Sequence, residues 1–366
     1  MIDKNKFRYW SHHRQLLDKS GTNLNDVLRS IIGVYSSHPS GPLSLYARVR
    51  SFSEKEFYKL DEKRLAIRVP AMRQSVYMLP TETARLAVAA TIHPSDDPYW
   101  EKRYSQKYRA ISKDKYKLWQ VQILKIVTRP LAAAEIKQTV KIPDQIFKSV
   151  LNRMAFEGSL LRIGAKSLRS NIISYVSTKS WIKEHSPRLE SINKSLVWLA
   201  GEYLRVFGPA RIKDFQWWAG IAVKRAKEAL AAHETVPIST EYILRSNDLK
   251  EFESYTKPMK DNLDLLPQWD CYTMGYAPDG RRRFVDPEMQ NQIYGALGAT
   301  GGNALGTVLV NGQAYGSWNH RFKGRHLHIT LNMFEKPSNL LNKDIIEKFG
   351  KIAELLKASD IILDKK

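Results

Sequence analysis

Closely spaced histidines and glycines are the first features of the sequence that could support chemistry. His326 and His328 alternate along a predicted strand, so both imidazoles face one side, as a metal site would require. No third ligand lies nearby in the sequence, which favours an ordinary sheet face. The glycine-rich segment 295–306 lacks the Gly-Lys-Ser/Thr ending and the strand-to-helix context of a phosphate loop, so a flexible hairpin loop is the better interpretation.

Basic clusters suggest contact with a polyanion. His12 and His13 lie in a basic N-terminal helix, where a solvated or DNA-facing pair is a better interpretation than a catalytic one. Arg281 to Arg283 follow a predicted turn and fit phosphate contact and a solvated loop equally well. The sequence has no signature of nucleotide hydrolysis, Ser-His-Asp catalysis or zinc hydrolysis, and its single cysteine, Cys271, excludes an internal disulfide.

The net charge narrows the class of partner. The sequence has 58 Lys and Arg residues against 37 Asp and Glu, a formal net charge of +21. Such an excess suggests a polyanionic partner, and its spread along the chain predicts a broad basic surface; a merely basic protein is the alternative. Apolar runs of about 18–20 residues and the apolar core of a signal peptide are absent from the sequence. We therefore expect a cytoplasmic protein with no membrane contact, no cofactor or metal, and no obligatory protein partner.

The elements that must position these side chains form repeated units. Residues 119–177 and the segment from about 195 onward each predict three helices, and the first set closes with two strands around a turn at 164–167. Three helices closed by a β-hairpin is the winged-helix order, in which the helix after the turn can enter a DNA groove. Helical modules that never touch DNA, or that bind protein, are the alternatives.

Strands and tight turns replace helices from about residue 263. Alternation predicts strands at 269–276 and 326–331, and Asn311-Gly312 predicts a type I′ hairpin. An amphipathic helix is expected at 343–357. The C-terminal end therefore resembles a small antiparallel sheet or barrel with a terminal helix.

Three longer blocks resemble one known family. LLPQWDCYTMGY at 265–276 resembles its LLPxFDxYLLGY block, FGPARIKDFQWWAG at 207–220 resembles GPATLxDFxWWSGL, and MRQSVYML at 72–79 resembles MRGTLHLV. Their order and spacing also fit, so the resemblance covers nearly the whole chain. The family is the AlkZ/YcaQ-type winged-helix DNA glycosylases, whose members excise modified bases, including alkylated bases and interstrand crosslinks.

The resemblance implies an α+β fold of tandem winged-helix (helix-turn-helix) domains in a C-shape, with a small antiparallel β-barrel-like domain at the C-terminus. We place an N-terminal winged-helix-like domain at 1–112, a second winged helix at 113–185, a third at 186–255, and the C-terminal domain with its terminal helix at 256–366. Seven basic side chains are the candidate DNA contacts: Arg73, Arg162, Lys166, Arg169, Arg281, Arg282 and Arg283.

The resemblance places the catalytic motif after residues 32–34. Active family members carry Gln-x-Gln or Gln-x-Asp there, which is thought to position the attacking water. In this sequence Tyr35 and Ser37 occupy the two glutamine positions, and His38 occupies the following acidic one. A shift by one residue would make the pair Ser36 and His38. Both glutamines are absent in either alignment.

This altered segment still has groups that hydrolysis of an N-glycosidic bond needs. The reaction passes through an oxocarbenium-like sugar, and a water must be held beside C1′. A neutral His38 is able to accept the proton from that water, and a hydroxyl of Tyr35, Ser36 or Ser37 to orient it. The alternative is structural, because Ser-Ser-His-Pro segments often cap helices and form turns.

These observations lead to three hypotheses. The first is a monofunctional DNA glycosylase that removes an alkylated, crosslinked or phage-type hypermodified base from duplex DNA, in DNA repair or anti-phage defence. The second is a non-catalytic winged-helix DNA-binding protein or regulator that has lost the glutamines. The third is a protein-interaction scaffold. Release of a free base separates the first from the other two.

Overall fold

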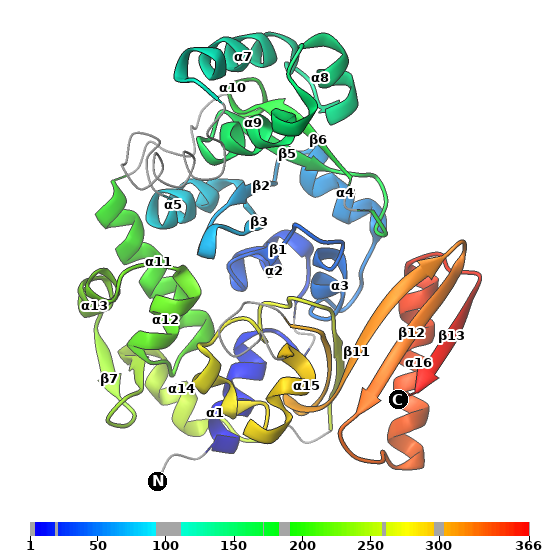
Figure 1. Ribbon diagram of the computed structural model, residues 1–366. Helices are drawn as coiled ribbons and strands as arrows, with labels where there is room; N and C mark the ends of the chain where they lie inside the picture. Colours follow the sequence, from blue (N-terminus) through cyan, green and yellow to red (C-terminus); the bar gives the residue numbers. More distant parts are fainter. Residues whose placement is uncertain are drawn as a thin grey trace.

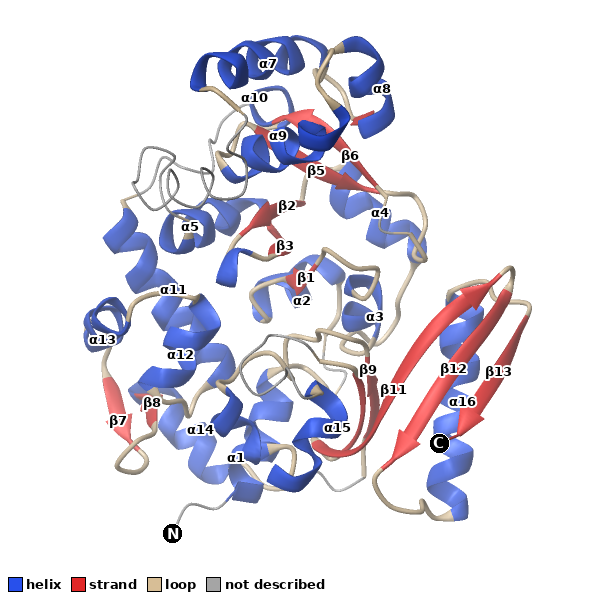
Figure 2. Cartoon of the chain, in the orientation of Figure 1, coloured by secondary structure: helices blue, strands red, loops and turns tan. Residues whose placement is uncertain are grey.

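The structure is a computed structural model. It describes residues 4–18, 21–92, 111–170, 172–182, 191–257, 261–295 and 304–365. Within these ranges the chain forms helices and mostly antiparallel sheets (Figure 2).

The first unit follows the N-terminal helix α1 (Lys4–Arg14). Its elements are α2 (Leu24–Ser30), β1 (Val34–Tyr35), α3 (Gly41–Tyr46), α4 (Glu54–Glu62), β2 (Ala66–Pro70), the short 3-10 helix η1 (Met72–Gln74) and β3 (Val76–Pro80), followed by α5 (Thr81–Thr91). Asn23 and Ser53 cap α2 and α4, because each side chain accepts a hydrogen bond from a backbone N–H in the first turn. This order is a helix, a strand, two helices and a β-hairpin.

The second unit has the same order of elements. It contains α7 (Lys113–Ile126), β4 (Leu131–Ala132), α8 (Ala133–Thr139), α9 (Asp144–Phe156), β5 (Leu160–Gly164), β6 (Ile173–Ser177) and the short helix α10 (Thr178–Trp181). Its apolar side chains, including Ile123, Val150 and Leu151, bury one another in a core that belongs to this unit. The sequence pattern predicts this unit well, because its contacts are local.

One sheet connects the first two units. Its strand order is β1-β3-β2-β5-β6-β4, and the two hairpins meet where Arg68 of β2 lies opposite Arg162 of β5. The sheet therefore crosses the boundary expected between residues 112 and 113.

The third unit packs beside the first. Its elements are α11 (Ile192–Phe207), α12 (Ile212–Ala219), α13 (Val223–Ala231), β7 (Thr235–Pro237) and β8 (Ile243–Arg245). An isolated bridge between Ala210 and Ile243 takes the place of the short strand. Side chains of β3, α11 and the loop at 267–277 (the 270s loop), such as Leu79, Leu199 and Tyr276, share one buried cluster. This cluster holds the first unit, the third unit and the C-terminal part together.

The C-terminal part begins after the short elements η2 (Ser246–Asp248) and α14 (Leu249–Ser254). Its strands are β9 (Leu263–Leu266), β10 (Gly306–Val310), β11 (Gln313–Lys323), β12 (His326–Met333) and β13 (Asp360–Lys365), with α16 (Asn339–Leu355) before the last strand. Between β9 and β10 lie η3 (Pro278–Arg283), η4 (Pro287–Met289) and α15 (Gln290–Tyr294).

The C-terminal part is expected from the sequence to be a small antiparallel sheet or barrel; in the described residues it is an open sheet with one parallel pair of strands. Its order is β13-β12-β11-β10-β9, so among the described residues β9 and β13 are open edges, and β13 pairs with β12 in parallel. The strand expected at 269–276 is wrong, because strand structure ends at Leu266 and tight turns follow. The Asn311-Gly312 hairpin is confirmed: both residues have positive φ, as a type I′ turn requires.

In Figure 1 the first unit lies at the centre. The second unit is at the top, the third at the left, and β11, β12, β13 and α16 at the right. The first unit, which carries the candidate catalytic segment after β1, therefore lies between the second unit, the third unit and the C-terminal strands.

Candidate active site and nucleic-acid interface

The candidate catalytic segment begins in a strained turn. Ile32 and Gly33 both have positive φ, 57° and 76°. A Cβ on Gly33 would lie 2.4 Å from the carbonyl oxygen of Met78, so only glycine fits this position. The turn leads into β1, which pairs with β3 and places Tyr35 opposite Tyr77. Strained backbone is concentrated at functional sites, which is consistent with a site here.

Aromatic rings surround Tyr35 and His38. The ring of Tyr35 lies 6.3 Å from that of Tyr77 and 5.2 Å from that of Trp269, centroid to centroid. The imidazole of His38 meets Trp269 edge to face at 5.0 Å. Trp269 has a φ of 57°, a strained conformation in a non-glycine residue. Rings of this kind are what a base flipped out of a duplex stacks against.

Ser36 faces the opposite side from Tyr35, as alternation along a strand requires. Its N–H donates to the carbonyl of Val76 at 2.8 Å, and its Oγ accepts a hydrogen bond from Nε of Arg68 at 2.9 Å. Arg68 is only 5% exposed and forms a buried ion pair with Asp61. Burial raises the pKa of Asp61, and the Arg68 guanidinium opposes that rise. Tyr35 and Ser36, the first members of the two alignments, thus have different partners, whereas His38 shares the Trp269 ring with Tyr35.

His38 has the properties of a neutral base. It is half-buried, and burial lowers its pKa from the ordinary value of 6.5. Its Nδ1 is buried and has no hydrogen-bond partner among the residues that the structure describes. An imidazole that is neutral near pH 7 and has an open acceptor is suited to take a proton. Ser37, in contrast, is exposed.

Two residues near this segment were missed by the sequence reasoning. His320 on β11 stacks on Trp318 at 5.6 Å; burial, and repulsion from His38 when that imidazole is protonated, lower its pKa to about 4. No local motif could have found His320, because the C-terminal sheet brings it to the site. Tyr77 had a signal, since it stands at the histidine of the family's MRGTLHLV block; burial raises its pKa.

The basic residues of the second hairpin, formed by β5 and β6, mostly contact other groups of the protein. Arg162 is 6% exposed and donates to Oδ1 of Asn152 at 3.1 Å, so its guanidinium is buried within the protein in this conformation, and its role as a phosphate contact stays a prediction. Arg169 donates to the carbonyls of Leu356 and Lys357 at the end of α16, and its guanidinium lies 4.2 Å from the ring of Phe322.

Lys166 is the exposed cation of this hairpin. Its side chain is 78% exposed and pairs with Glu62 at 2.9 Å. Such an exposed pair is weak, so Lys166 remains a candidate DNA contact.

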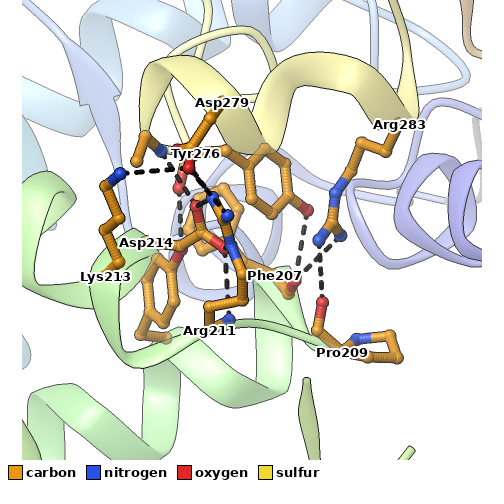
Figure 3. Close-up of polar contacts among 11 residues, drawn as sticks. Phe207, Pro209, Arg211, Lys213, Asp214, Tyr276, Asp279 and Arg283 are labelled. Carbon is orange, nitrogen blue, oxygen red and sulfur yellow. Dashed lines mark hydrogen bonds and ion pairs between the residues drawn. The ribbon is translucent and has the colours of Figure 1, made fainter. Parts of the chain in front are cut away.

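Two of the three arginines at 281–283 are also buried. Arg281 is 0% exposed and Arg283 is 4% exposed, whereas Arg282 is exposed. Figure 3 shows the guanidinium of Arg283 pointing at the Pro209 carbonyl, to which its Nη2 donates at 2.9 Å. In this conformation its charge holds η3 against the turn before α12, and phosphate contact by Arg283 stays a prediction.

An ion-pair network fixes η3 to α12. Arg211 donates to Asp214 and to Asp279, with distances of 2.9–3.1 Å, and Lys213 joins Asp279 at 3.0 Å (Figure 3). These charges lower the pKa of Asp279 well below its usual range. Because these ion pairs hold η3 against α12, the backbone that carries its arginines has a fixed position.

Arg73 and Arg281 meet at one tryptophan. The guanidinium carbons of Arg73 and Arg281 lie 3.9 Å and 5.2 Å from the centre of the Trp217 ring, and that of Arg281 lies 3.7 Å from the ring of Tyr294. Burial lowers the pKa of both arginines. Arg73 is half-buried and stays a candidate DNA contact; Arg281, fully buried, is no surface contact in this conformation.

The histidine pairs do not form metal sites. His12 is 1% exposed and lies 2.7 Å from Asp264, so the solvated or DNA-facing interpretation is wrong for it. His326 hydrogen-bonds Asp360 at 2.6 Å. In the described ranges no group of three or more His, Cys, Asp or Glu residues could hold a metal ion. Most of the glycine-rich segment 295–306 lies outside the described residues.

Comparison with known proteins identifies the family and the fold. The model of the AlkZ-like DNA glycosylase family matches residues 36–355, and the chain therefore belongs to that family. The structure of Streptomyces sahachiroi DNA glycosylase AlkZ is similar over 99% of both chains, with a TM-score of 0.75 and 16% sequence identity. At this identity the likeness shows the fold alone. No curated protein matches the chain. In the part of the chain that the structure describes, no helix is long and apolar enough to cross a bilayer.

Proposed function

We propose that this protein is a monofunctional DNA glycosylase that hydrolyses the N-glycosidic bond of a modified base in duplex DNA, in cytoplasmic DNA repair or anti-phage defence. The observation that carries the proposal is His38, a neutral imidazole with an open Nδ1 beside the ring of Trp269. Membership of the AlkZ-like DNA glycosylase family supports the reaction class.

The proposed reaction uses one water. The target base leaves the stack and packs against the aromatic rings around Tyr35. The water oxygen bonds to C1′ while the C1′–N bond breaks and its electron pair leaves with the base. His38 accepts the proton of the water, which then passes through solvent to the departing base. A hydroxyl of Tyr35, Ser36 or Ser37 orients the water.

The substrate proposal follows from the motif. A glutamine pair is uncharged at every pH and suits a base that is already cationic and leaves readily. A histidine adds a proton acceptor near neutral pH, so we propose a neutral, bulky modified base, such as a phage-type pyrimidine, as the preferred substrate.

The proposed DNA surface rests on charge and on repeated units. The formal net charge of +21 favours a polyanion. We propose that the three units of helices and hairpin are winged helices arranged in a C around the duplex. Arg73, Lys166 and Arg282, which are half-buried or exposed, would contact phosphates.

A non-catalytic DNA-binding protein is the second candidate. The observation that favours it is the loss of both motif glutamines together with the histidine of the MRGTLHLV block, replaced here by Tyr35, Ser37 and Tyr77. On this view the aromatic rings fill a former active site.

One experiment separates the two candidates. The protein is incubated with duplexes that carry alkylated, crosslinked or hypermodified bases, and released bases are identified by mass spectrometry. A glycosylase releases a base from at least one duplex, and a His326→Ala variant, altered at an exposed histidine on β12, releases it equally well. Tight binding of every duplex with no release from any would support the non-catalytic candidate.

A further inference from the structure

We propose that a small pocket beneath the second hairpin holds the attacking water, and that Arg68 is the residue that positions it. The proposal rests on the proposed glycosylase function and assigns a place in the structure to its nucleophile. The pocket is lined by Ser36, His38 and Arg68 from the first unit, and by Gly164, Ser167 and Ser170 from the second.

The size of the pocket suits water and excludes a base. Its volume is about 40 Å³. Since one water needs roughly 10–15 Å³ on this measure, the pocket has room for about three waters. A nucleobase must therefore bind elsewhere, and the aromatic rings on the Tyr35 side are the available surface.

The polar groups of the pocket have complementary roles. Because the Ser36 oxygen already accepts the Nε–H of Arg68, its own hydroxyl hydrogen is directed away from Arg68. His38 lines the same pocket, and its Nδ1 is buried without a hydrogen-bond partner among the described residues, so it is free to accept one. A water between them receives a hydrogen bond from Ser36 and gives one to His38, the arrangement that general-base attack requires.

Arg68 can hold Ser36 only because it is itself fixed on two sides. Asp61 of α4 forms an ion pair with Arg68 and neutralises its charge, which would otherwise oppose a cationic sugar. Gly164 at the end of β5 fits against the guanidinium so closely that a Cβ there would lie 2.6 Å from Nη2 and 2.8 Å from Cζ. The Gly164 N–H also hydrogen-bonds Asp61. The second unit thus completes a site whose reacting groups belong to the first.

Gly164→Ala is the decisive variant. The new methyl group displaces the guanidinium of Arg68 and changes neither a charge nor a group that touches DNA. A misplacement of about 1 Å can reduce a rate by about 100-fold, so we expect kcat for base release to fall about 10- to 100-fold with KM and duplex affinity unchanged. Gly350→Ala on α16, where a Cβ meets no atom within 4 Å, is the matched control and should keep the wild-type kcat.

A second variant covers the case in which Gly164→Ala does not fold. Arg68→Lys retains the charge opposite Asp61 and lacks the Nε–H that Ser36 accepts, so it should show the same loss of kcat. Wild-type kcat in a folded Gly164→Ala or Arg68→Lys protein would overturn the positioning role and leave the glycosylase proposal standing.

An NMR titration tests the positioning without relying on activity. In the free protein the pKa of His38 should rise in Gly164→Ala, because the water that donates to its neutral Nδ1 is no longer held by Ser36 while all charges stay. It should not move in Gly350→Ala. If the wild type releases no base, the glycosylase proposal fails, and this titration still decides whether Arg68 and Ser36 act on His38; an unchanged His38 pKa in Gly164→Ala overturns that link.

Discussion

At the residue scale, the proposed mechanism depends most on His38, because this side chain is its general base. Replacing His38 with alanine should reduce base release by about 10²–10⁴-fold, the usual contribution of a general base. Duplex binding should change little, because a single side chain adds little to a contact with many phosphates. Single-turnover base release and a binding titration measure the two effects.

The outcome of this substitution also identifies the correct alignment of the motif. Full activity in His38→Ala, with Ser37→Ala or Tyr35→Phe inactive, would move the role to the positions of the family's glutamines. Normal cleavage by all of these variants would show that the motif lies elsewhere.

The environment of His38 sets the pH dependence of the proposed reaction. An unperturbed histidine becomes protonated below pH ~6.5, and the proton-accepting form is then lost. Burial lowers the pKa of His38, so the neutral form persists to a pH below 6.5. The midpoint of the fall in rate should therefore lie below pH 6.5. A pH profile of single-turnover cleavage gives this midpoint; a midpoint above pH 6.5 would contradict the neutral, buried state of His38.

The absence of lysine near the motif predicts the chemical class of the product. Residues 32–42 contain no lysine, so this segment has no amine to form a Schiff base with the sugar. Cleavage should leave an intact abasic site, and strand breaks should appear only after treatment with alkali. Gel analysis with and without alkali measures this. A covalent protein–DNA adduct trapped by borohydride would show an amine nucleophile instead.

At the element scale, the sequence predicts features that depend on neighbouring residues better than features that depend on contacts between distant residues. The Asn311-Gly312 turn is specified by two residues, and the structure has it. The alternation at 269–276 was misleading, because the Asp270 carboxylate is buried against Arg48 and accepts the N–H of Tyr272, which turns the chain. The pairing of β2 with β5 joins residues far apart in the sequence, and no local pattern encodes it.

The same distinction explains the candidate site. Resemblance to the family located Tyr35 to His38, and the structure places Tyr35 and His38 together at Trp269. The sequence could not show that Arg162 and Arg283 are buried, because residue type alone does not distinguish an arginine that contacts a phosphate from one that contacts a backbone carbonyl.

The buried pair of Arg48 and Asp270 should dominate the stability of the 270s loop. Both side chains are 0% exposed, and Arg48 donates to both carboxylate oxygens at 2.7 and 2.8 Å. Arg48→Met leaves an uncompensated buried carboxylate, so the free energy of unfolding should fall by about 3–5 kcal/mol. Chemical denaturation measures this. Lys351→Ala, which breaks an exposed pair with Glu347, should cost less than about 1 kcal/mol; equal losses would refute the ranking.

At the scale of the whole molecule, charge should control binding. A protein that neutralises about six phosphates loses about a thousandfold in duplex affinity between 50 and 200 mM salt, because counterions are released. With a net charge of +21 we expect a loss of this order and little sequence preference. Fluorescence anisotropy across this salt range tests it, and a flat response would argue against an electrostatic interface.

The sheet that the first two units share limits how the protein could be rearranged by recombination or design. A free-standing second unit would leave the backbone of β5 unpaired where it meets β2, and an exposed strand edge invites aggregation. A replacement unit with any residue other than glycine at position 164 would also place a side chain directly against Arg68. We therefore expect the first two units to tolerate exchange only together, and the third unit or the C-terminal sheet to be a better place to introduce a new specificity than the second unit alone.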